Sequence, residues 1–276
     1  MWHRLARTDD ASLDTYHKDH WVDIEPERFD RYEALFRLDD RRADALLARV
    51  GVTPGEVIVD FGCGPGYVAA QLARLAGPEG HVHAVDVNAA FVERARAVAA
   101  EAGRADRVTV HHSLDERVPL PDGSVDRVYA KNVLEYVPDL RAVLAELHRI
   151  LRPGGTMVAS DSDFGFVVVE PLLPTEVTEL FEAAAPAFRE PFVGRKLRSA
   201  YLEAGFIDVD VAITAAVDTA GHLRGVIENM FGYATRFQRM TAARAAELRA
   251  KVDDALTAGT FQAVLPQWWV IGRKAN

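Results

Sequence analysis

The residues with the clearest chemical potential are Asp60 and the three glycines that follow it at alternating positions, Gly62, Gly64 and Gly66. Glycine has no Cβ, so such a turn can bend sharply and let the backbone approach a bound molecule closely. A carboxylate beside the turn repels a pyrophosphate but attracts a cationic amino group. The pattern therefore favours a nucleoside ligand that carries an ammonium group rather than a diphosphate.

The spacing of the glycines excludes two common phosphate-binding loops. A dinucleotide fingerprint requires Gly-x-Gly-x-x-Gly, and its third glycine would fall on Tyr67 or on Ala69, depending on which glycine begins the count. Pro65 also lacks an N–H group to offer a phosphate. No Gly-x-x-x-x-Gly-Lys-Ser/Thr run is present, so a triphosphate loop is excluded on sequence.

The flanking residues predict the elements that position this turn. Residues 57–59 are all apolar and β-branched, which is typical of a strand buried on both faces of a parallel sheet. From Tyr67 to Ala76 the apolar residues recur with a helical period, and Gly77-Pro78 then ends the pattern. A strand, a glycine turn and a helix together predict the first half of a nucleotide-binding βαβ unit.

The run from Asp60 to Gly66 resembles the first motif of the class I S-adenosylmethionine-dependent methyltransferases, an acidic residue followed by Gly-x-Gly-x-Gly. The resemblance extends over about residues 45–215 and implies an α/β fold: a Rossmann-like, seven-stranded, mostly parallel sheet with helices on both faces. Further landmarks of the family follow in the expected order: a second strand ending in an acid at 81–87, the approach to the fourth strand at 120–129, the motif after it at 132–139, the helix stop before the fifth strand at 151–155, and the signal before the sixth at 204–206.

The resemblance implies S-adenosyl-L-methionine as the cofactor and assigns its parts to residues. The turn from Asp60 to Gly64 would hold the methionine part, Asp86 the ribose hydroxyls, Val87 the adenine, and residues 113–115 the adenine amino group. We interpret Cys63 as a small residue that fits the turn rather than as a nucleophile. The predicted cofactor contacts are Tyr16, Asp60, Gly62, Cys63, Gly64, Asp86, Val87, Ser113, Leu114, Asp115, Asn132 and Val137.

A methyl group on a sulfonium is already activated, so its transfer needs close approach, alignment and a deprotonated nucleophile. A general base helps when the acceptor is a hydroxyl or a protonated amine. The predicted candidates for this role are His20 and Asp163, with weaker ones at His17, His112, Glu135, Tyr136, Asp161 and His222. Each also has a structural interpretation, as part of a polar N-terminal arm, as a solvated histidine, or as a cap at a strand end. No metal site is predicted, although Asp161 and Asp163 leave a metal-dependent mechanism open.

The remaining segments predict how the chain is organised. We expect one methyltransferase domain over 1–276, with an N-terminal helical cap at 1–50, a cofactor-binding core at 51–160 and a C-terminal half at 161–276. The cap is expected to be helical from about Arg28 to Val50, and a last strand is expected from Phe261 to Arg273. Ligands of open α/β sheets lie beyond the carboxyl ends of the strands. By resemblance, the acceptor pocket would then come from 10–35, 161–195 and 216–240, with pocket and helical lid segments at about 162–200 and 216–263.

Composition narrows the class of partner. The 276 residues include 32 basic and 41 acidic ones, giving a formal net charge of −9 at pH 7, and no run of Lys or Arg stands out. A nucleic-acid partner is therefore disfavoured. The single cysteine excludes an internal disulfide and suits a reducing compartment. No stretch of 18 apolar residues is present. We predict a cytoplasmic monomer or homodimer with no membrane partner.

Three functions from different classes remain compatible with the sequence. The first is methyl transfer to oxygen, nitrogen or carbon of a small-molecule acceptor, for which a natural-product intermediate is one candidate. The second is another use of the same cofactor, such as a cyclisation or a rearrangement. The third is a non-catalytic subunit that binds the cofactor. Detection of S-adenosylhomocysteine as a product separates the first from the second, and a binding measurement with the cofactor separates the third from both.

Overall fold

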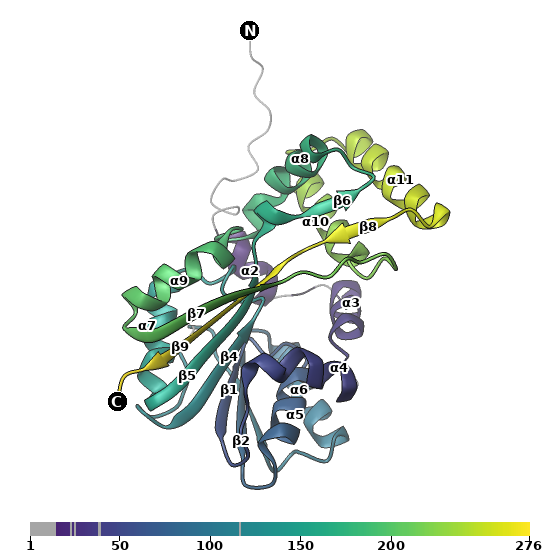
Figure 1. Ribbon diagram of the computed structural model, residues 1–276. Coiled ribbons are helices and arrows are strands. Elements are labelled where there is room, and N and C mark those ends of the chain that lie inside the picture. The colour runs from purple at the N-terminus through teal and green to yellow at the C-terminus, as the bar shows by residue number, and fades with distance from the viewer. Residues whose placement is uncertain (1–14, 23, 25, 38–39, 116) are drawn as a thin grey trace.

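Seven strands form the central sheet, in the spatial order β3-β2-β1-β4-β5-β9-β7 (Figure 1). The computed structural model describes residues 15–22, 24, 26–37, 40–115 and 117–276. Strand β9 runs antiparallel to both of its neighbours, whereas the pairs from β3 to β5 are parallel. The predicted seven-stranded, mostly parallel sheet is thus confirmed. The strands are β1 (Val57–Phe61), β2 (His81–Asp86), β3 (Val108–His112), β4 (Val125–Lys131), β5 (Leu151–Ser162), β7 (Phe206–Thr214) and β9 (Gln267–Lys274).

Helices cover both faces of the sheet, as predicted. One face packs against α4 (Asp40–Leu47), α5 (Tyr67–Ala76) and α6 (Ala89–Glu101), and the other against α7 (Leu140–Ile150) and α9 (Val193–Glu203). Each helix buries an apolar stripe, such as Val143, Leu144 and Leu147 of α7. Helix α7 ends at Ile150, and the predicted helix stop at 151–155 lies within β5 itself.

The N-terminal cap is helical, but the predicted single stretch from Arg28 to Val50 is broken into α3 (Pro26–Phe36), α4 and a 3-10 turn at Ala48–Val50. An additional helix, α2 (Tyr16–Val22), precedes them within the segment predicted as the N-terminal cap. The buried residues of α2 are His17 and His20. Because these are polar types, the helix carries no apolar period that sequence alone could recognise.

A second unit, called the lid below, stands beyond one end of the sheet (Figure 1). It comprises the two-stranded sheet of β6 (Val168–Glu170) and β8 (Gln262–Val264), with α8 (Pro174–Ala184), a 3-10 turn at Ala185–Ala187, α10 (Arg224–Arg236) and α11 (Ala242–Ala258). The lid has its own apolar core, which includes Leu180, Phe231 and Leu248. The predicted last strand over 261–273 was wrong in its extent, because the structure divides this segment into β8 and β9. Strand pairing is interrupted between these two strands, where Pro266 has no N–H to donate.

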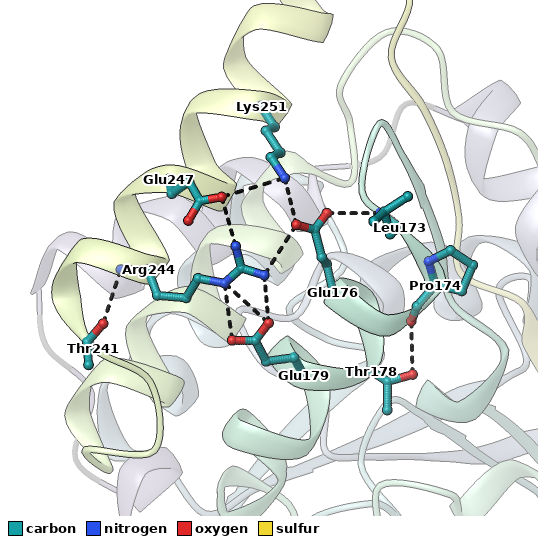
Figure 2. Close-up of polar contacts among 9 residues, drawn as sticks. All are labelled: Leu173, Pro174, Glu176, Thr178, Glu179, Thr241, Arg244, Glu247 and Lys251. Carbon is teal, nitrogen blue, oxygen red and sulfur yellow. Dashed lines mark hydrogen bonds and ion pairs between the residues drawn. The ribbon is translucent and has the colours of Figure 1, made fainter.

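Ion pairs join the two outer helices of the lid (Figure 2). Arg244 of α11 contacts Glu179 at 2.9 Å and Glu176 at 3.2 Å, both on α8. Lys251, two turns further along α11, contacts Glu176 at 2.6 Å, and the other oxygen of Glu176 accepts from the Leu173 N–H at the start of α8. Glu176 therefore fixes the start of α8 and its contact with α11 together.

No helix among the described residues is both long enough and apolar enough to cross a membrane.

Candidate functional site

A cavity with about 1070 Å³ of empty space, including solvent at its mouth, opens beyond the carboxyl ends of β1, β2 and β4. This is the edge at which open α/β sheets bind their ligands. The predicted contacts that line it are Asp60, Gly62, Cys63, Gly64, Asp86, Val87, Ser113, Asn132 and Val137.

The glycine turn forms the floor of this cavity, and close packing dictates its residue types. Gly62 and Gly66 have φ values of 75° and 84°, a region that side chains disfavour. A Cβ at Gly62 would lie 2.2 Å from Cγ2 of Val133, and one at Gly66 would lie 2.6 Å from Cα of Ala95. Cys63 is buried between them, and burial raises the pKa of its thiol well above the usual value. The thiol is therefore no nucleophile, in line with its interpretation as a small packing residue.

Two carboxylates stand at the edge of the turn. Asp60 is only 2% exposed, and its Oδ2 atom has no hydrogen-bond partner among the described residues. Burial, and then the nearby charge of Asp86, raise the pKa of Asp60 to about 7. The Asp86 carboxylate accepts hydrogen bonds from the N–H groups of Gly64 at 2.7 Å and Asn88 at 2.9 Å. Asp60 therefore offers an unused acceptor, while Asp86 also holds the turn in place.

Asn132 completes this side of the cavity immediately after β4. Its φ of 51° is unusual for a residue with a side chain, and its N–H donates to the Ser160 carbonyl at 2.9 Å. Its Oδ1 atom is buried and has no partner within the described part of the chain. Unpaired buried polar atoms are rare in folded proteins, so Asp60 and Asn132 mark the cavity as a place for a polar ligand.

Comparison with known proteins decides the family. Residues 59–159 match the family described as "Methyltransferase domain". Demethylmenaquinone methyltransferase from Geobacillus kaustophilus is 30% identical over 204 residues, which cover 66% of this chain and 85% of the relative. The chain belongs to the class I S-adenosylmethionine-dependent methyltransferases. S-adenosylmethionine is its cofactor, as predicted.

Two further comparisons extend over different parts of this chain. Dimethylglycine N-methyltransferase from Parasynechococcus marenigrum is 37% identical over 130 residues, 47% of this chain and 46% of the relative. Phosphoethanolamine N-methyltransferase 2 from Haemonchus contortus, solved with S-adenosyl-L-methionine, has a TM-score of 0.63 at 17% identity and shares the fold over 94% of this chain and 60% of that one. The chain spans less than two thirds of the length of the first curated relatives that it matches.

The structure adds lining residues that sequence reasoning did not name. Trp21 of α2, which lies within the predicted acceptor segment 10–35, and Phe36 of α3 bring aromatic rings to the cavity from the N-terminal cap. Lys131 reaches the cavity from the end of β4. Tyr67 also lines it, and its hydroxyl donates to Glu33 of α3 at 2.8 Å. The position of Lys131 directly before Asn132, at a strand end, was a signal that could have identified it.

Three of the predicted cofactor contacts do not line the cavity. Leu114 is 53% exposed. Asp115 points to its own loop, where it accepts from the Ser113 hydroxyl at 3.2 Å and from the Arg117 N–H at 3.3 Å. Tyr16 packs its ring on His20 and Phe237, with centroids 4.6 Å and 4.9 Å away.

Both predicted bases also need correction. Asp163 is fully buried and forms a two-fold ion pair with Arg195 of α9, with distances of 2.5 Å and 2.7 Å. It is a structural anchor outside the cavity. His20 is buried beside Tyr16 rather than in the cavity lining, and burial, aided by Arg28, lowers the pKa of His20 to about 3. An imidazole with so low a pKa is a weak base at neutral pH. His17, by contrast, does line the cavity.

The lid meets the cavity indirectly. Tyr136 lines the cavity, and its ring stacks on Phe188, which belongs to the core of the lid, with centroids 5.3 Å apart. Behind Tyr136 lie Glu135 and Asp161, two buried carboxyls. Burial and their proximity raise the pKa of Glu135 well above the usual range, and burial raises that of Asp161 to about 7. No group of three or more His, Cys, Asp or Glu residues in the described ranges is arranged to hold a metal ion.

Proposed function

We propose that the protein transfers a methyl group from S-adenosylmethionine to a small-molecule acceptor. The observation that carries this proposal is the unused acceptor of Asp60 beside a glycine turn in which a Cβ at Gly62 or Gly66 would clash with neighbouring residues. When bound, the cofactor supplies an activated methyl group on its sulfonium. The chain then has to bind both reactants, align them and exclude water.

The residues of the cavity fit the parts of the cofactor. Asp60 would accept from the ammonium group of the methionine part, since its Oδ2 atom has no other partner in the described residues. Each oxygen of Asp86 accepts one backbone N–H and keeps a second lone pair for a ribose hydroxyl. Val87 and Val137 offer apolar surface for the adenine.

The acceptor would meet the cofactor between the N-terminal cap and Tyr136. Trp21, Phe36 and Tyr136 present aromatic surface on this side of the cavity, and His17 lies among them. We propose His17, in place of His20 and Asp163, as the group that removes a proton from the acceptor. The names of the similar enzymes, which refer to dimethylglycine and demethylmenaquinone, support a small-molecule acceptor rather than a macromolecular one. Of the proposed acceptor segments 10–35, 161–195 and 216–240, only the first contributes described residues to the lining of this cavity; residues 10–14, 23 and 25 lie outside the described residues.

Binding and turnover test this proposal together. S-adenosyl-L-methionine should bind the purified chain in isothermal titration calorimetry. Incubation with a panel of small amines, hydroxy compounds and quinones should release S-adenosylhomocysteine, measured by mass spectrometry, in a reaction that His17→Ala slows. His112→Ala is the matched control, because His112 bonds to the Val87 carbonyl and lies outside the cavity lining.

The outcomes distinguish the candidate functions. Absence of cofactor binding at high micromolar concentration would contradict the assignment of the cavity. Conversion of a substrate without S-adenosylhomocysteine would favour the cyclisation or rearrangement alternative. Binding with no turnover of any acceptor from a cell extract would favour a non-catalytic subunit.

We also propose that the protein works in the cytoplasm, as a monomer or homodimer, with a small molecule as its only substrate partner. The net charge of −9 and the absence of a Lys/Arg run support the lack of a nucleic-acid partner. The single, buried Cys63 is compatible with a reducing compartment. Size-exclusion chromatography with light scattering tests the oligomeric state.

A further inference from the structure

Two opposite charges line the cavity from neighbouring strands without pairing with each other. Asp60 belongs to β1 and Lys131 to β4, and both line the cavity. Asp60 is aligned with Tyr129 in the parallel ladder, so Lys131, two residues further along, lies on the same face of the sheet. No ion pair joins the two side chains, although both are described by the structure and each contributes to the electrostatic environment of the other.

The ammonium group of Lys131 has no ionic partner in the described residues. Its recorded contact is with the ring of Phe36, whose centroid lies 5.5 Å from Nζ. Burial lowers the pKa of Lys131, and the carboxyls of Asp161, Glu135 and Asp60 oppose that shift. A buried charge without a direct partner is costly to a folded protein. Such a lysine is expected where a ligand brings the missing anion.

The glycine turn has no spare backbone donor for an anion. The N–H groups of Gly62 and Cys63 both donate to the Val85 carbonyl, at 2.8 Å and 3.0 Å. The Gly64 N–H donates to Asp86 at 2.7 Å. The last two positions of the turn add nothing, because Pro65 has no N–H and the Gly66 N–H is bonded within the turn. A carboxylate bound beside Asp60 must therefore find its donor elsewhere.

We propose that Asp60 and Lys131 together recognise the zwitterionic end of the cofactor, with Lys131 binding its carboxylate and Asp60 its ammonium group. An α-amino acid carries both charges on one carbon, so an ammonium held by Asp60 brings a carboxylate to the same wall of the cavity. The inference rests on the proposed cofactor site and assigns to Lys131 a part in it that the family motif does not contain. Lys131 thereby becomes the residue that distinguishes the intact cofactor from nucleosides that lack the amino-acid carboxylate.

Three related ligands test this assignment by isothermal titration calorimetry on the full chain. S-adenosylhomocysteine carries the ammonium and the carboxylate, S-adenosyl-3-thiopropylamine carries only the ammonium, and 5′-methylthioadenosine carries neither. The wild-type protein should bind S-adenosylhomocysteine more tightly than the thiopropylamine. Lys131→Met should weaken S-adenosylhomocysteine by about 10- to 100-fold, the range for a hydrogen bond to a charged group. It should not weaken the two ligands without a carboxylate.

Two matched variants complete the design. Lys131→Arg keeps the positive charge and should retain most of the preference for S-adenosylhomocysteine over the thiopropylamine. Asp60→Asn removes the partner of the ammonium, so it should weaken both ligands that carry this group and leave 5′-methylthioadenosine unchanged. The affinities of these variants for the three ligands would then report on Asp60 and Lys131 separately.

Several results would overturn the proposal. Equal weakening of all three ligands by Lys131→Met would show a purely structural role, and no weakening would show that the lysine does not reach the carboxylate. Loss of the preference in Lys18→Met instead would assign the carboxylate to the other lysine of the lining. If Lys131→Met does not fold, the wild-type comparison decides, because equal affinity for S-adenosylhomocysteine and the thiopropylamine contradicts the proposal. Failure of the wild-type protein to bind S-adenosylhomocysteine at all would instead contradict the cofactor site.

Discussion

Asp86 combines a binding role with a structural one, because its carboxylate accepts from the N–H groups of Gly64 and Asn88. Replacing it with alanine removes the proposed ribose acceptor and leaves two backbone donors unpaired. We expect Asp86→Ala to weaken S-adenosylhomocysteine binding by about 10- to 100-fold and to lower the free energy of unfolding by about 1–3 kcal/mol. Calorimetric titration and urea denaturation measure the two effects. Unchanged binding in a folded variant would remove Asp86 from the site, and His112→Ala serves as the variant expected to bind normally.

Asp60 predicts a pH dependence of cofactor binding. Its pKa is raised to about 7 by burial and by Asp86, so the carboxyl is increasingly protonated, and neutral, below that pH. Only the ionised form attracts the ammonium group of the ligand. Affinity for S-adenosylhomocysteine should therefore rise as the pH increases from about 6 to 8, by at most tenfold per unit on the acidic side. The rise should be absent in Asp60→Asn and absent for 5′-methylthioadenosine, which has no ammonium group. If the affinity of the wild-type protein for S-adenosylhomocysteine does not change with pH, Asp60 does not bind the ammonium group.

At the scale of elements, one side chain fastens α2 over the cavity. The Oδ1 atom of Asn88 accepts from the Phe91 N–H and caps α6, while its Nδ2 donates to the Trp21 carbonyl of α2 at 2.8 Å. Asn88→Asp keeps the cap but loses the donor. We expect it to retain the stability of α6 and to accelerate amide hydrogen exchange in α2, measured by mass spectrometry.

Asn88→Ala provides the comparison, since it loses both contacts and should in addition lower the free energy of unfolding by about 1 kcal/mol. Exchange in α2 at the wild-type rate in Asn88→Asp would show that the bond to Trp21 does not hold the helix. A faster rate in both variants, with a stability loss only in the alanine variant, would separate the two functions of the side chain.

The elements that sequence could predict are those with a local signal. The strand, glycine turn and helix over 57–76 were predicted as observed, because apolar period, glycine spacing and helix stop all lie within the segment. Strand β6 was missed, and β8 was merged with β9 into one predicted strand, because β6 and β8 have three residues each and exist through pairing with the other, far along the chain. In the site, Asp163 could not be recognised as an anchor because its partner Arg195 stands 32 positions later.

The whole molecule contains an apolar core in the lid that is distinct from the two cores on the faces of the sheet. The lid also touches the cap through polar contacts: Arg28 donates to the Tyr233 hydroxyl at 3.0 Å, and Asn229 donates to the Tyr32 hydroxyl at 3.1 Å. In the parts that the structure describes, the lining of the cofactor cavity includes cap residues but none from the helices or strands of the lid. The lid can therefore influence the site through the cap and through Tyr136, without contacting the cofactor.

This division predicts that the lid and the core respond differently to ligand. Leu248 is fully buried in the lid, and Leu72 of α5 is fully buried in one of the two cores on the faces of the sheet. Truncation of either to alanine should lower the free energy of unfolding of its own unit by about 2–5 kcal/mol. In Leu248→Ala, differential scanning calorimetry should resolve an unfolding transition of the lid at low temperature, and S-adenosylhomocysteine should not shift its midpoint. The midpoint temperature of the second transition should rise with ligand concentration by mass action. In Leu72→Ala the midpoint temperature of the ligand-sensitive transition itself should be lower than in the wild type. One transition in Leu248→Ala, shifted as a whole by the ligand, would mean that the lid and the sheet unfold as a single unit.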